Sequence, residues 1–300
     1  KNLDNHDEAS THQDNRSGQN EAHDTDETSD EAPLKPLRLA ILGRPNVGKS
    51  TLINKLIGKN RLLTSDQPGV TRDSIEIDWM FKDQPIVLID TAGIRRKARV
   101  DDSLEQASIQ HAFQAMKYVH VVILVIDALS PLDKQELILA SRVIEEGRCL
   151  VLALNKWDKA DTSQLKTLES SLHHVLSQVK GIPMIPISAL YEKNLHQLIE
   201  SALNVYKTWN KRIPTAQLNI FLDHATQRHP PKLSGPGRIR LKYMTQIKTR
   251  PPTFALFASK PSELPDSYVR YLLDGIREAF DVWGVPLRLQ LKKNKNPYVK

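Results

Sequence analysis

From residue 37 onward, short apolar runs alternate with longer stretches in which apolar residues recur at helical spacing. The short runs are rich in β-branched residues, which is typical of strands buried on both faces of a parallel sheet. We expect such strands at Leu37–Leu42, Ile86–Asp90, Val119–Asp127, Leu150–Asn155 and Met184–Ile187. The segment Ser74–Phe81 alternates as an edge strand does, and the break at Lys82-Asp83-Gln84 predicts an antiparallel hairpin.

Helical segments separate these strands. We expect them at Lys49–Ile57, Leu104–Lys117, Lys134–Glu146, Gln164–Val179 and Leu195–Lys211. Strands and helices that alternate at this length build a doubly wound sheet with helices on both faces. The sequence therefore predicts an α/β fold with a mostly parallel sheet over residues 34–211.

The pattern changes near Ile213 and Pro214, where a second, smaller domain is expected to begin. Its predicted helices are Thr215–Arg228 and Asp266–Phe280, and its predicted strands are Ile239–Ile247, Thr253–Ser259 and Val285–Lys292. Helices packed against one short sheet make a small α+β domain, which we place at residues 212–300.

Charge is distributed unevenly along the chain. Residues 1–33 contain ten acidic residues against two basic ones, and Leu3 is their only large aliphatic residue. Such a segment cannot bury enough apolar area to offset its conformational entropy, so we predict a disordered acidic linker. Residues 206–300 contain eighteen basic residues against six acidic ones, which favours contact with nucleic acid.

Several classes of protein are excluded by composition. The single cysteine, Cys149, cannot form an intramolecular disulfide and fits a reducing compartment. The longest apolar run, Val119–Ile126, is broken by His120 and is too short to span a membrane. The chain begins at Lys1 with polar and acidic residues, unlike a signal or transit peptide. We expect a cytoplasmic protein, represented here by a fragment.

A phosphate-binding candidate follows the first predicted strand. It is Gly43-Arg44-Pro45-Asn46-Val47-Gly48-Lys49-Ser50, followed by Thr51, and it matches G-x-x-x-x-G-K-[ST] between a strand and a helix. The glycines let backbone N–H groups wrap a polyphosphate at a helix N-terminus. Lys49 would neutralise the β- and γ-phosphate oxygens and Ser50 would ligate Mg²⁺. The α/β fold is therefore predicted to be that of a P-loop NTPase, the alternative being a glycine turn with a solvated lysine.

The base is expected to be chosen at Asn155-Lys156-Trp157-Asp158, where another predicted strand ends. The Asp158 carboxylate can accept two hydrogen bonds from the N1–H and N2–H groups of guanine, which adenine lacks. Ser188-Ala189-Leu190 can supply a backbone N–H to the guanine O6. An Asn at a strand end followed by solvated Lys and Asp is the alternative.

Two further segments complete a candidate switch that responds to the γ-phosphate. Asp90 can hold Mg²⁺ through water, and the Gly93 N–H can bond the γ-phosphate. Thr71, in the loop after the first helix, can complete the Mg²⁺ shell while the γ-phosphate is present. Asp90 and Gly93 belong to one predicted loop that follows a strand, Asp90-Thr91-Ala92-Gly93-Ile94.

This ordered set of motifs resembles the elements shared by GTPases of the translation-factor class. Residues 34–300 more narrowly resemble the C-terminal part of the Der (EngA) family of bacterial GTPases. The discriminating stretch is Leu241-Lys242-Tyr243-Met244-Thr245-Gln246-Ile247-Lys248-Thr249-Arg250-Pro251-Pro252-Thr253-Phe254. The resemblance implies a second GTPase domain followed by a KH-like domain, with a first GTPase domain as a missing partner. It also implies a role in assembly of the large ribosomal subunit, with rRNA as a contact.

The resemblance also bears on catalysis. Ile94 stands where many GTPases have the Gln that orients water. Relatives with an apolar residue there and an Asn at the position of Asn46 use K⁺ against the phosphates. We therefore predict hydrolysis stimulated by K⁺, with Asn46 and carbonyls of residues 64–69 as ligands, and with Lys49 and Thr71 as the other catalytic residues.

The basic C-terminal domain is the expected RNA contact. Its candidate cations are Lys242, Lys248, Arg250, Lys260, Lys292, Lys293 and Lys295. Tyr243 and Phe254 can stack on bases or simply pack. No G-x-x-G loop occurs in 206–300, so electrostatic contact with rRNA, or docking to a neighbouring GTPase domain, is favoured over sequence-specific reading. The competing readings of the whole chain are an Era-like or tRNA-modifying GTPase, a non-catalytic RNA-binding module with a structural GTP site, and an ATPase.

Overall fold

The computed structural model describes residues 35–59, 76–89, 118–130, 132–161, 179–231 and 239–293, together with residues 116, 166, 168 and 171. The chain divides into two units, Lys1–Leu34 and Lys35–Lys300. The predicted linker at 1–33, the helix at Leu104–Lys117 apart from Met116, and most of the helix at Gln164–Val179 lie outside the described residues. Val179 lies in a bend and not in a helix, contrary to that prediction.

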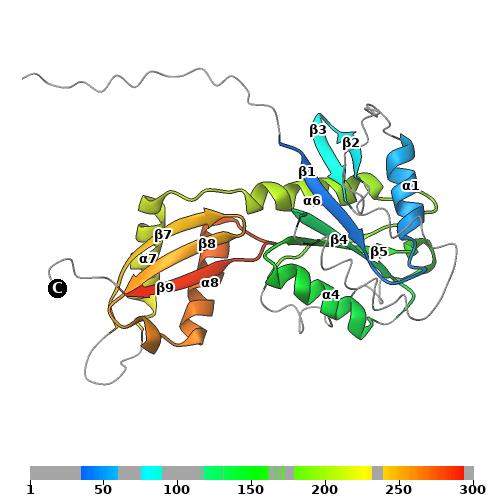
Figure 1. Ribbon diagram of the computed structural model, residues 1–300. Coiled ribbons are helices and arrows are strands. Elements are labelled where there is room, and N and C mark those ends of the chain that lie inside the picture. The colour runs from blue at the N-terminus through cyan, green and yellow to red at the C-terminus, as the bar shows by residue number, and fades with distance from the viewer. Residues whose placement is uncertain are drawn as a thin grey trace, which may run out of the picture. The chain divides into compact units, whose positions relative to one another are not determined.

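A six-stranded sheet with the order β2-β3-β1-β4-β5-β6 forms the centre of the first domain, whose strands lie between Leu37 and Pro186 (Figure 1). Its parallel strands are β1 (Leu37–Leu42), β3 (Gln84–Leu88), β4 (Val121–Asp127), β5 (Cys149–Asn155) and β6 (Met184–Pro186). The edge strand β2 (Ile77–Phe81) pairs antiparallel with β3. Lys82 and Asp83 turn this hairpin with φ values of 47° and 61°, as a primed β-turn requires.

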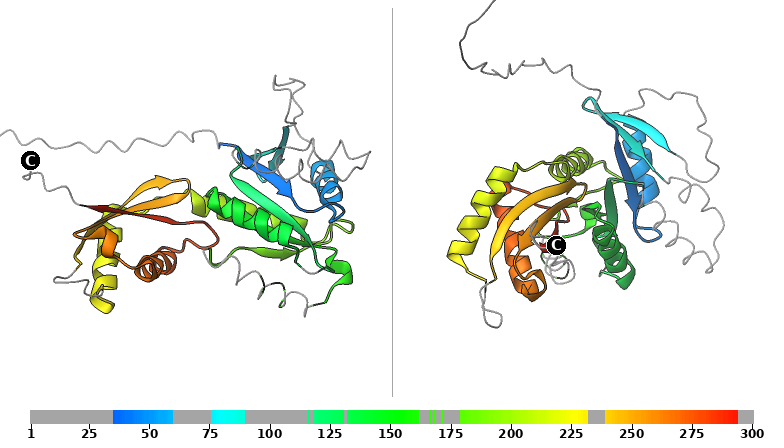
Figure 2. Two further views of the ribbon diagram at one scale, coloured as in Figure 1. Left: turned by 60° about the horizontal axis from the view of Figure 1, so that its bottom comes forward. Right: turned by 60° about the vertical axis from the view of Figure 1, so that its left-hand side comes forward.

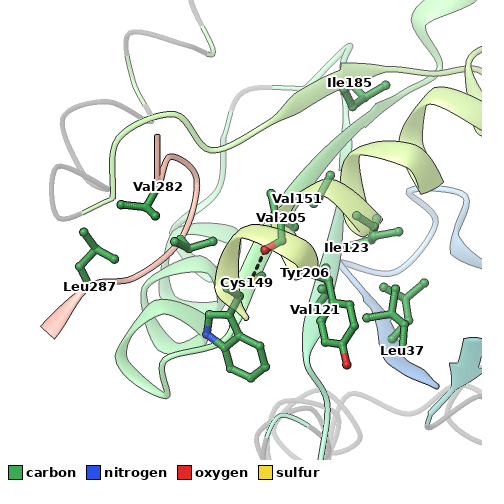
Figure 3. Packing of buried hydrophobic residues seen from close by; sticks show 14 of the residues in the cluster. Leu37, Val121, Ile123, Cys149, Val151, Ile185, Val205, Tyr206, Val282 and Leu287 are labelled. Atoms are coloured by element: carbon green, nitrogen blue, oxygen red, sulfur yellow. Dashed lines mark hydrogen bonds between the residues drawn. The ribbon is translucent and has the colours of Figure 1, made fainter. Parts of the chain in front are cut away.

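Alternate residues of the central strands point into two separate hydrophobic clusters. On β4, Val121 and Ile123 belong to one cluster, which α1 (Lys49–Lys59) and α6 (Leu195–Trp209) cover. Val122 and Leu124 belong to the other, which α4 (Lys134–Glu145) covers. Figure 3 shows the first cluster, where Cys149, completely buried, packs beside α6 as an apolar residue would. The doubly wound arrangement predicted from the strand pattern is confirmed.

A second sheet follows, with three strands in the order β7-β8-β9. Its strands are β7 (Leu241–Thr249), β8 (Pro252–Ala258) and β9 (Arg288–Lys293). The helices that accompany them are α7 (Thr215–Arg228) and α8 (Asp266–Phe280), with a short 3₁₀ turn, η2 (Pro261–Glu263), between β8 and α8. A second 3₁₀ turn, η1 (Trp157–Lys159), follows β5. The strand expected from Val285 begins only at Arg288, where pairing with Thr253 starts. Pro251 and Pro252 have no N–H with which to extend the ladder.

Hydrogen bonds connect the second sheet to the chain segment after α6 and to α4. Gln246, almost fully buried, accepts a hydrogen bond from the Ile213 N–H at 2.7 Å and donates to the Lys211 carbonyl at 3.0 Å. Arg288 at the start of β9 donates to the carbonyl of Glu145, the last residue of α4, at 2.6 Å. The C-terminal sheet is therefore tied both to the linker after α6 and to α4.

His120 predicts a pH dependence of stability. Its Nδ1 accepts a hydrogen bond from the Arg38 N–H at 3.1 Å, and burial together with Arg250, Arg148 and Arg38 lowers its pKa to about 4. An unfolded histidine titrates near 6.5, so the unfolded state binds a proton first as pH falls. The free energy of unfolding should therefore decrease from about pH 6.5 towards pH 4, by about 1–2 kcal/mol for this half-buried ring.

Urea unfolding between pH 7.5 and pH 4.5 measures this loss. The control is His120→Asn, whose Oδ1 can still accept from the Arg38 N–H but does not titrate. The variant should show a shallower decline than the parent chain. Parallel declines would show that His120 is not the group responsible.

Candidate nucleotide-binding site

The loop between β1 and α1 has a backbone that only glycine permits at two positions. Gly43 has φ 146° and Gly48 has φ 99°. A Cβ at Gly43 would lie 2.4 Å from the Val125 carbonyl oxygen, and one at Gly48 would lie 2.2 Å from Asn155 Nδ2. Helix α1 starts directly afterwards, with the Leu52 N–H bonded to the Gly48 carbonyl at 2.9 Å. The loop therefore presents its N–H groups at a helix N-terminus, as anion binding requires.

Asn155 connects this loop to the segment after β6. Its Nδ2 donates to the Val47 carbonyl at 2.7 Å, and its Oδ1 accepts from the Ala189 N–H at 2.9 Å. The side chain is almost completely buried at the end of β5. The sequence assigned Asn155 to guanine, whereas here both ends of its amide hold the protein's own backbone. It brings together three motifs that are far apart in the sequence.

Asp158 is exposed at the site, and Ser188, which is buried, holds it from beneath. Ser188 Oγ donates to Asp158 Oδ1 at 2.6 Å, and the Tyr191 N–H donates to Ser188 Oγ at 3.3 Å. The Ser188 hydrogen bond is the main cause that lowers the pKa of the exposed Asp158 carboxyl. The carboxylate is thus held in one orientation as an ionised acceptor. The sequence had pointed only to the backbone of Ser188.

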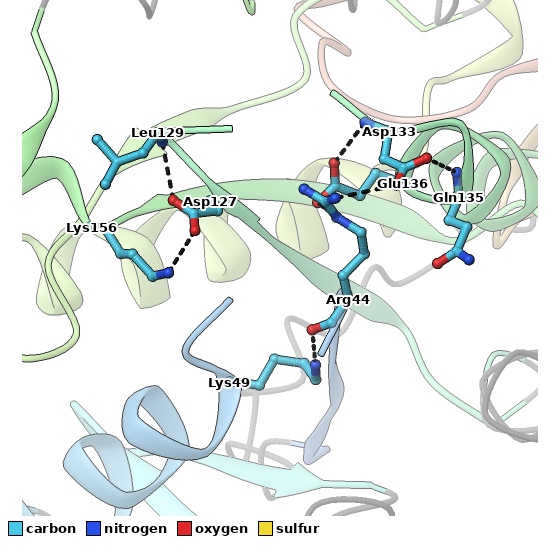
Figure 4. A network of polar contacts seen from close by, with 8 residues as sticks. All are labelled: Arg44, Lys49, Asp127, Leu129, Asp133, Gln135, Glu136 and Lys156. Carbon is cyan, nitrogen blue, oxygen red and sulfur yellow. Dashed lines mark hydrogen bonds and ion pairs between the residues drawn. The ribbon is translucent and has the colours of Figure 1, made fainter. Parts of the chain in front are cut away.

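Lys156 pairs with a residue that the sequence had not singled out. Its Nζ lies 2.6 Å from Asp127 Oδ2, and the Leu129 N–H donates to Asp127 Oδ1 at 3.0 Å (Figure 4). Asp127 ends β4, beside β5, so the register Asp127–Asn155 places it next to the loop after Asn155. The sequence shows only that Asp127 is an acidic residue at the end of a buried strand. Such a residue can have many roles, so the sequence alone does not identify it as the partner of Lys156.

A second polar network holds the phosphate-binding loop from its other side. Arg44 Nε lies 2.9 Å from Glu136 Oε1, and Arg44 Nη1 lies 3.2 Å from Asp133 Oδ2 (Figure 4). Glu136 is completely buried, and its second oxygen accepts from the Asp133 N–H at 3.1 Å in the capping box of α4. Lys49 Nζ in turn donates to the Arg44 carbonyl oxygen. The loop is thereby anchored to the N-terminus of α4.

The remaining candidate residues divide between described and undescribed parts. Pro45 and Asn46 are exposed, Asn46 with φ 63°; Ser50 is exposed and Thr51 half-buried in the first turn of α1. Trp157 is half-buried, and Leu190 has 59% of its surface exposed. Thr71, Asp90, Thr91, Ala92, Gly93 and Ile94 lie outside the described residues, as do residues 64–69. Within the described ranges, no group of three or more His, Cys, Asp or Glu side chains is placed to hold a metal ion.

The described motifs therefore converge at the carboxyl ends of β1, β5 and β6. The loop with Lys49 can hold a polyphosphate by backbone N–H groups and one ammonium group. The oriented Asp158 carboxylate can accept a pair of adjacent N–H donors from a base. None of the helices in the described part is long and apolar enough to cross a membrane.

Two family models match this chain. Residues 38–156 match the family described as 50S ribosome-binding GTPase, and residues 212–292 match the C-terminal KH-domain-like region of EngA bacterial GTPase enzymes. The chain thus carries the domain of a GTPase, followed by an EngA-type KH-like domain.

Curated relatives point in the same direction. GTPase Der of Rickettsia felis is 47% identical over 280 residues, covering 91% of this chain and 63% of the relative. GTPase Der of Azorhizobium caulinodans is 46% identical over 276 residues, covering 91% and 61%. An Era structure from Aquifex aeolicus aligns at 21% identity with a TM-score of 0.44, over 88% of this chain and 95% of that one. The two Der relatives and the EngA family model confirm the resemblance of this chain to the Der (EngA) GTPases, and the chain spans less than two thirds of the length of those relatives.

Proposed function

We propose that this chain is a GTP-hydrolysing switch whose nucleotide state controls its association with the large ribosomal subunit. The observation that carries the proposal is the pair of bonds from Asn155, which joins the phosphate-binding loop to the segment that orients Asp158. A site that reads a base and a polyphosphate at once needs such a connection. The similarity to Der supports the choice of GTP and of a ribosomal partner.

In this proposal residues 34–211 form the GTPase domain, 212–300 the KH-like domain and 1–33 a linker. Guanine would contact Asp158, with residues 188–190 lining the pocket and Asn155 holding it in shape. The phosphates would contact residues 43–51 and Gly93. The chain itself would position and neutralise the transferring phosphoryl group, with Lys49 as the principal cation.

The donors present fit the two cations proposed. Ser50 offers an exposed hydroxyl in the first turn of α1, suited to Mg²⁺, with Thr71 as a further ligand and Asp90 holding the ion through water. Asn46 offers an exposed amide in the phosphate-binding loop, whose oxygen is suited to K⁺. When bound, these ions would neutralise charge that develops on the phosphate oxygens.

Removing the Lys49 ammonium group tests the activity. Lys49→Ala should lower GTP turnover by about 100-fold or more, because the site loses its charge opposite the β- and γ-phosphates. Phosphate release measured in KCl with Mg²⁺ reports this loss. Lys55→Ala, on the same helix and paired at the surface with Glu192 at 3.0 Å, is the matched control and should turn over normally.

The same proteins test the finer points. Turnover in NaCl at equal ionic strength should fall below that in KCl, and equal rates would remove the K⁺ assignment. With GTP present, the parent chain should sediment with large ribosomal subunits more than Lys49→Ala does. If the parent turns over GTP no faster than Lys49→Ala, the turnover does not come from this site, and the proposed GTPase activity is wrong.

A further inference from the structure

The sheet of β7, β8 and β9 has one face covered by helices and one face that no described helix covers. Helices α7 and α8 lie on the same side of it (Figures 1 and 2). Met244, Phe254 and Leu256 point to that side and are completely buried. Phe254, which the sequence offered as a stacking residue, is therefore in the core and cannot contact a base.

The other face carries two aromatic rings and a cation in one row. Tyr243 on β7 pairs with Phe257 on β8, which pairs in turn with Lys292 on β9. The two rings have centroids 5.7 Å apart, and Tyr243 has 42% of its surface exposed. Gln290, exposed, lies one row further along the same face. We call Tyr243, Phe257, Gln290 and Lys292 the open sheet face.

The charge of the strands is complementary to a polyanion. The three strands contain five basic residues and no acidic one: Lys242, Lys248, Arg288, Lys292 and Lys293. The acids of residues 212–300 lie in or next to the helices instead: Asp266, Asp274 and Glu278 on α8, Asp281 directly after it, Asp223 on α7 and Glu263 in η2. Arg250, another RNA candidate from the sequence, lies over the rings of Tyr206 and Trp209 and is engaged there.

We propose that the open sheet face binds single-stranded RNA, with a base stacked on Tyr243 and Lys292 at a backbone phosphate. Aromatic rings on an open sheet bind unpaired bases, whose flat faces a duplex keeps inside its stack. Stacking accepts any base, which agrees with a KH-like domain that has no G-x-x-G clamp. This inference rests on the proposed function, because it assigns the ribosomal RNA contact to one surface.

Anisotropy of a labelled single-stranded 12-nucleotide RNA of mixed sequence, titrated with the full chain, tests the surface. Tyr243→Ala should weaken binding by about 5- to 150-fold, the effect of losing one stacked base, whereas Tyr243→Phe should bind normally. Lys292→Gln should reduce the slope of log affinity against log salt by about 0.7, the effect of one phosphate contact. The controls are Tyr118→Ala, an aromatic residue 66% exposed elsewhere, and Lys260→Gln, which removes a cation paired with Glu263.

Three results would each refute the assignment of RNA binding to the open sheet face. They are normal binding by Tyr243→Ala, an equal loss of binding in Tyr118→Ala, and equal competition by a duplex of the same sequence. GTP turnover, measured on the same samples, separates this inference from the proposed function. If turnover is normal while Tyr243→Ala binds RNA like the parent, only the surface is wrong. If the parent chain turns over no GTP, the proposed function fails. The RNA titration still shows whether the open sheet face binds RNA.

Discussion

Replacing Asp158 with asparagine should change the preferred base from guanine to xanthine. The carboxylate can accept both the N1–H and the N2–H of guanine, whereas an asparagine amide offers one acceptor and one N–H donor. The amide N–H would face the guanine amino group, so these two donors would oppose each other and neither would have an acceptor. Xanthine has a carbonyl oxygen at this position, which accepts the amide N–H. GDP affinity should fall by at least about 100-fold and XDP affinity should rise.

Titration of both nucleotides against parent and variant measures this change. Lys159→Gln, a neutral substitution at the next residue of η1, is the control and should keep the preference for guanine. Ser188→Ala should weaken GDP binding without admitting XDP, because it removes the 2.6 Å bond that orients the carboxylate and leaves the carboxylate itself. A preference for guanine that survives Asp158→Asn would remove the base assignment.

Helix positions were predictable where the sequence marks their ends. α7 and α8 begin and end at the predicted residues, and each follows a proline, Pro214 or Pro265, that cannot continue a preceding helix. The start of α4 is marked by Asp133 and Glu136, three residues apart, which form the capping box. Strand ends were less predictable, because a strand ends where its partner stops pairing.

Contacts between distant segments were outside the reach of pattern analysis. The motif predicts Gly48, but the reason for a glycine here is Asn155 Nδ2, which occupies the space of a Cβ from another strand. The partner of Lys156 is Asp127, and only the register of β4 against β5 brings them together. Motifs therefore identified the candidate site residues, and the sheet determines which of them hold the others in place.

Glu136→Ala should cause the largest loss of stability outside the apolar core. The carboxylate is completely buried and accepts from both Arg44 Nε and the Asp133 N–H. Its removal leaves the Arg44 guanidinium with Asp133, itself partly exposed, and removes half of the capping box. Loss of one partner of a buried ion pair costs about 3–5 kcal/mol, and with Asp133 retained we expect about 2–4 kcal/mol. Denaturant unfolding measures this loss.

The matched control is Glu145→Ala on the same helix, whose exposed carboxylate pairs with Arg142 at 3.2 Å and should contribute less than about 0.5 kcal/mol. Arg44→Met combined with Glu136→Met separates stability from loop position. Two apolar residues in contact can restore much of the stability, but no ion pair then fixes residue 44, whose carbonyl accepts from Lys49. Nucleotide affinity should therefore stay low in the double variant. Equal losses in Glu136→Ala and Glu145→Ala would mean that α4 does not anchor the phosphate-binding loop.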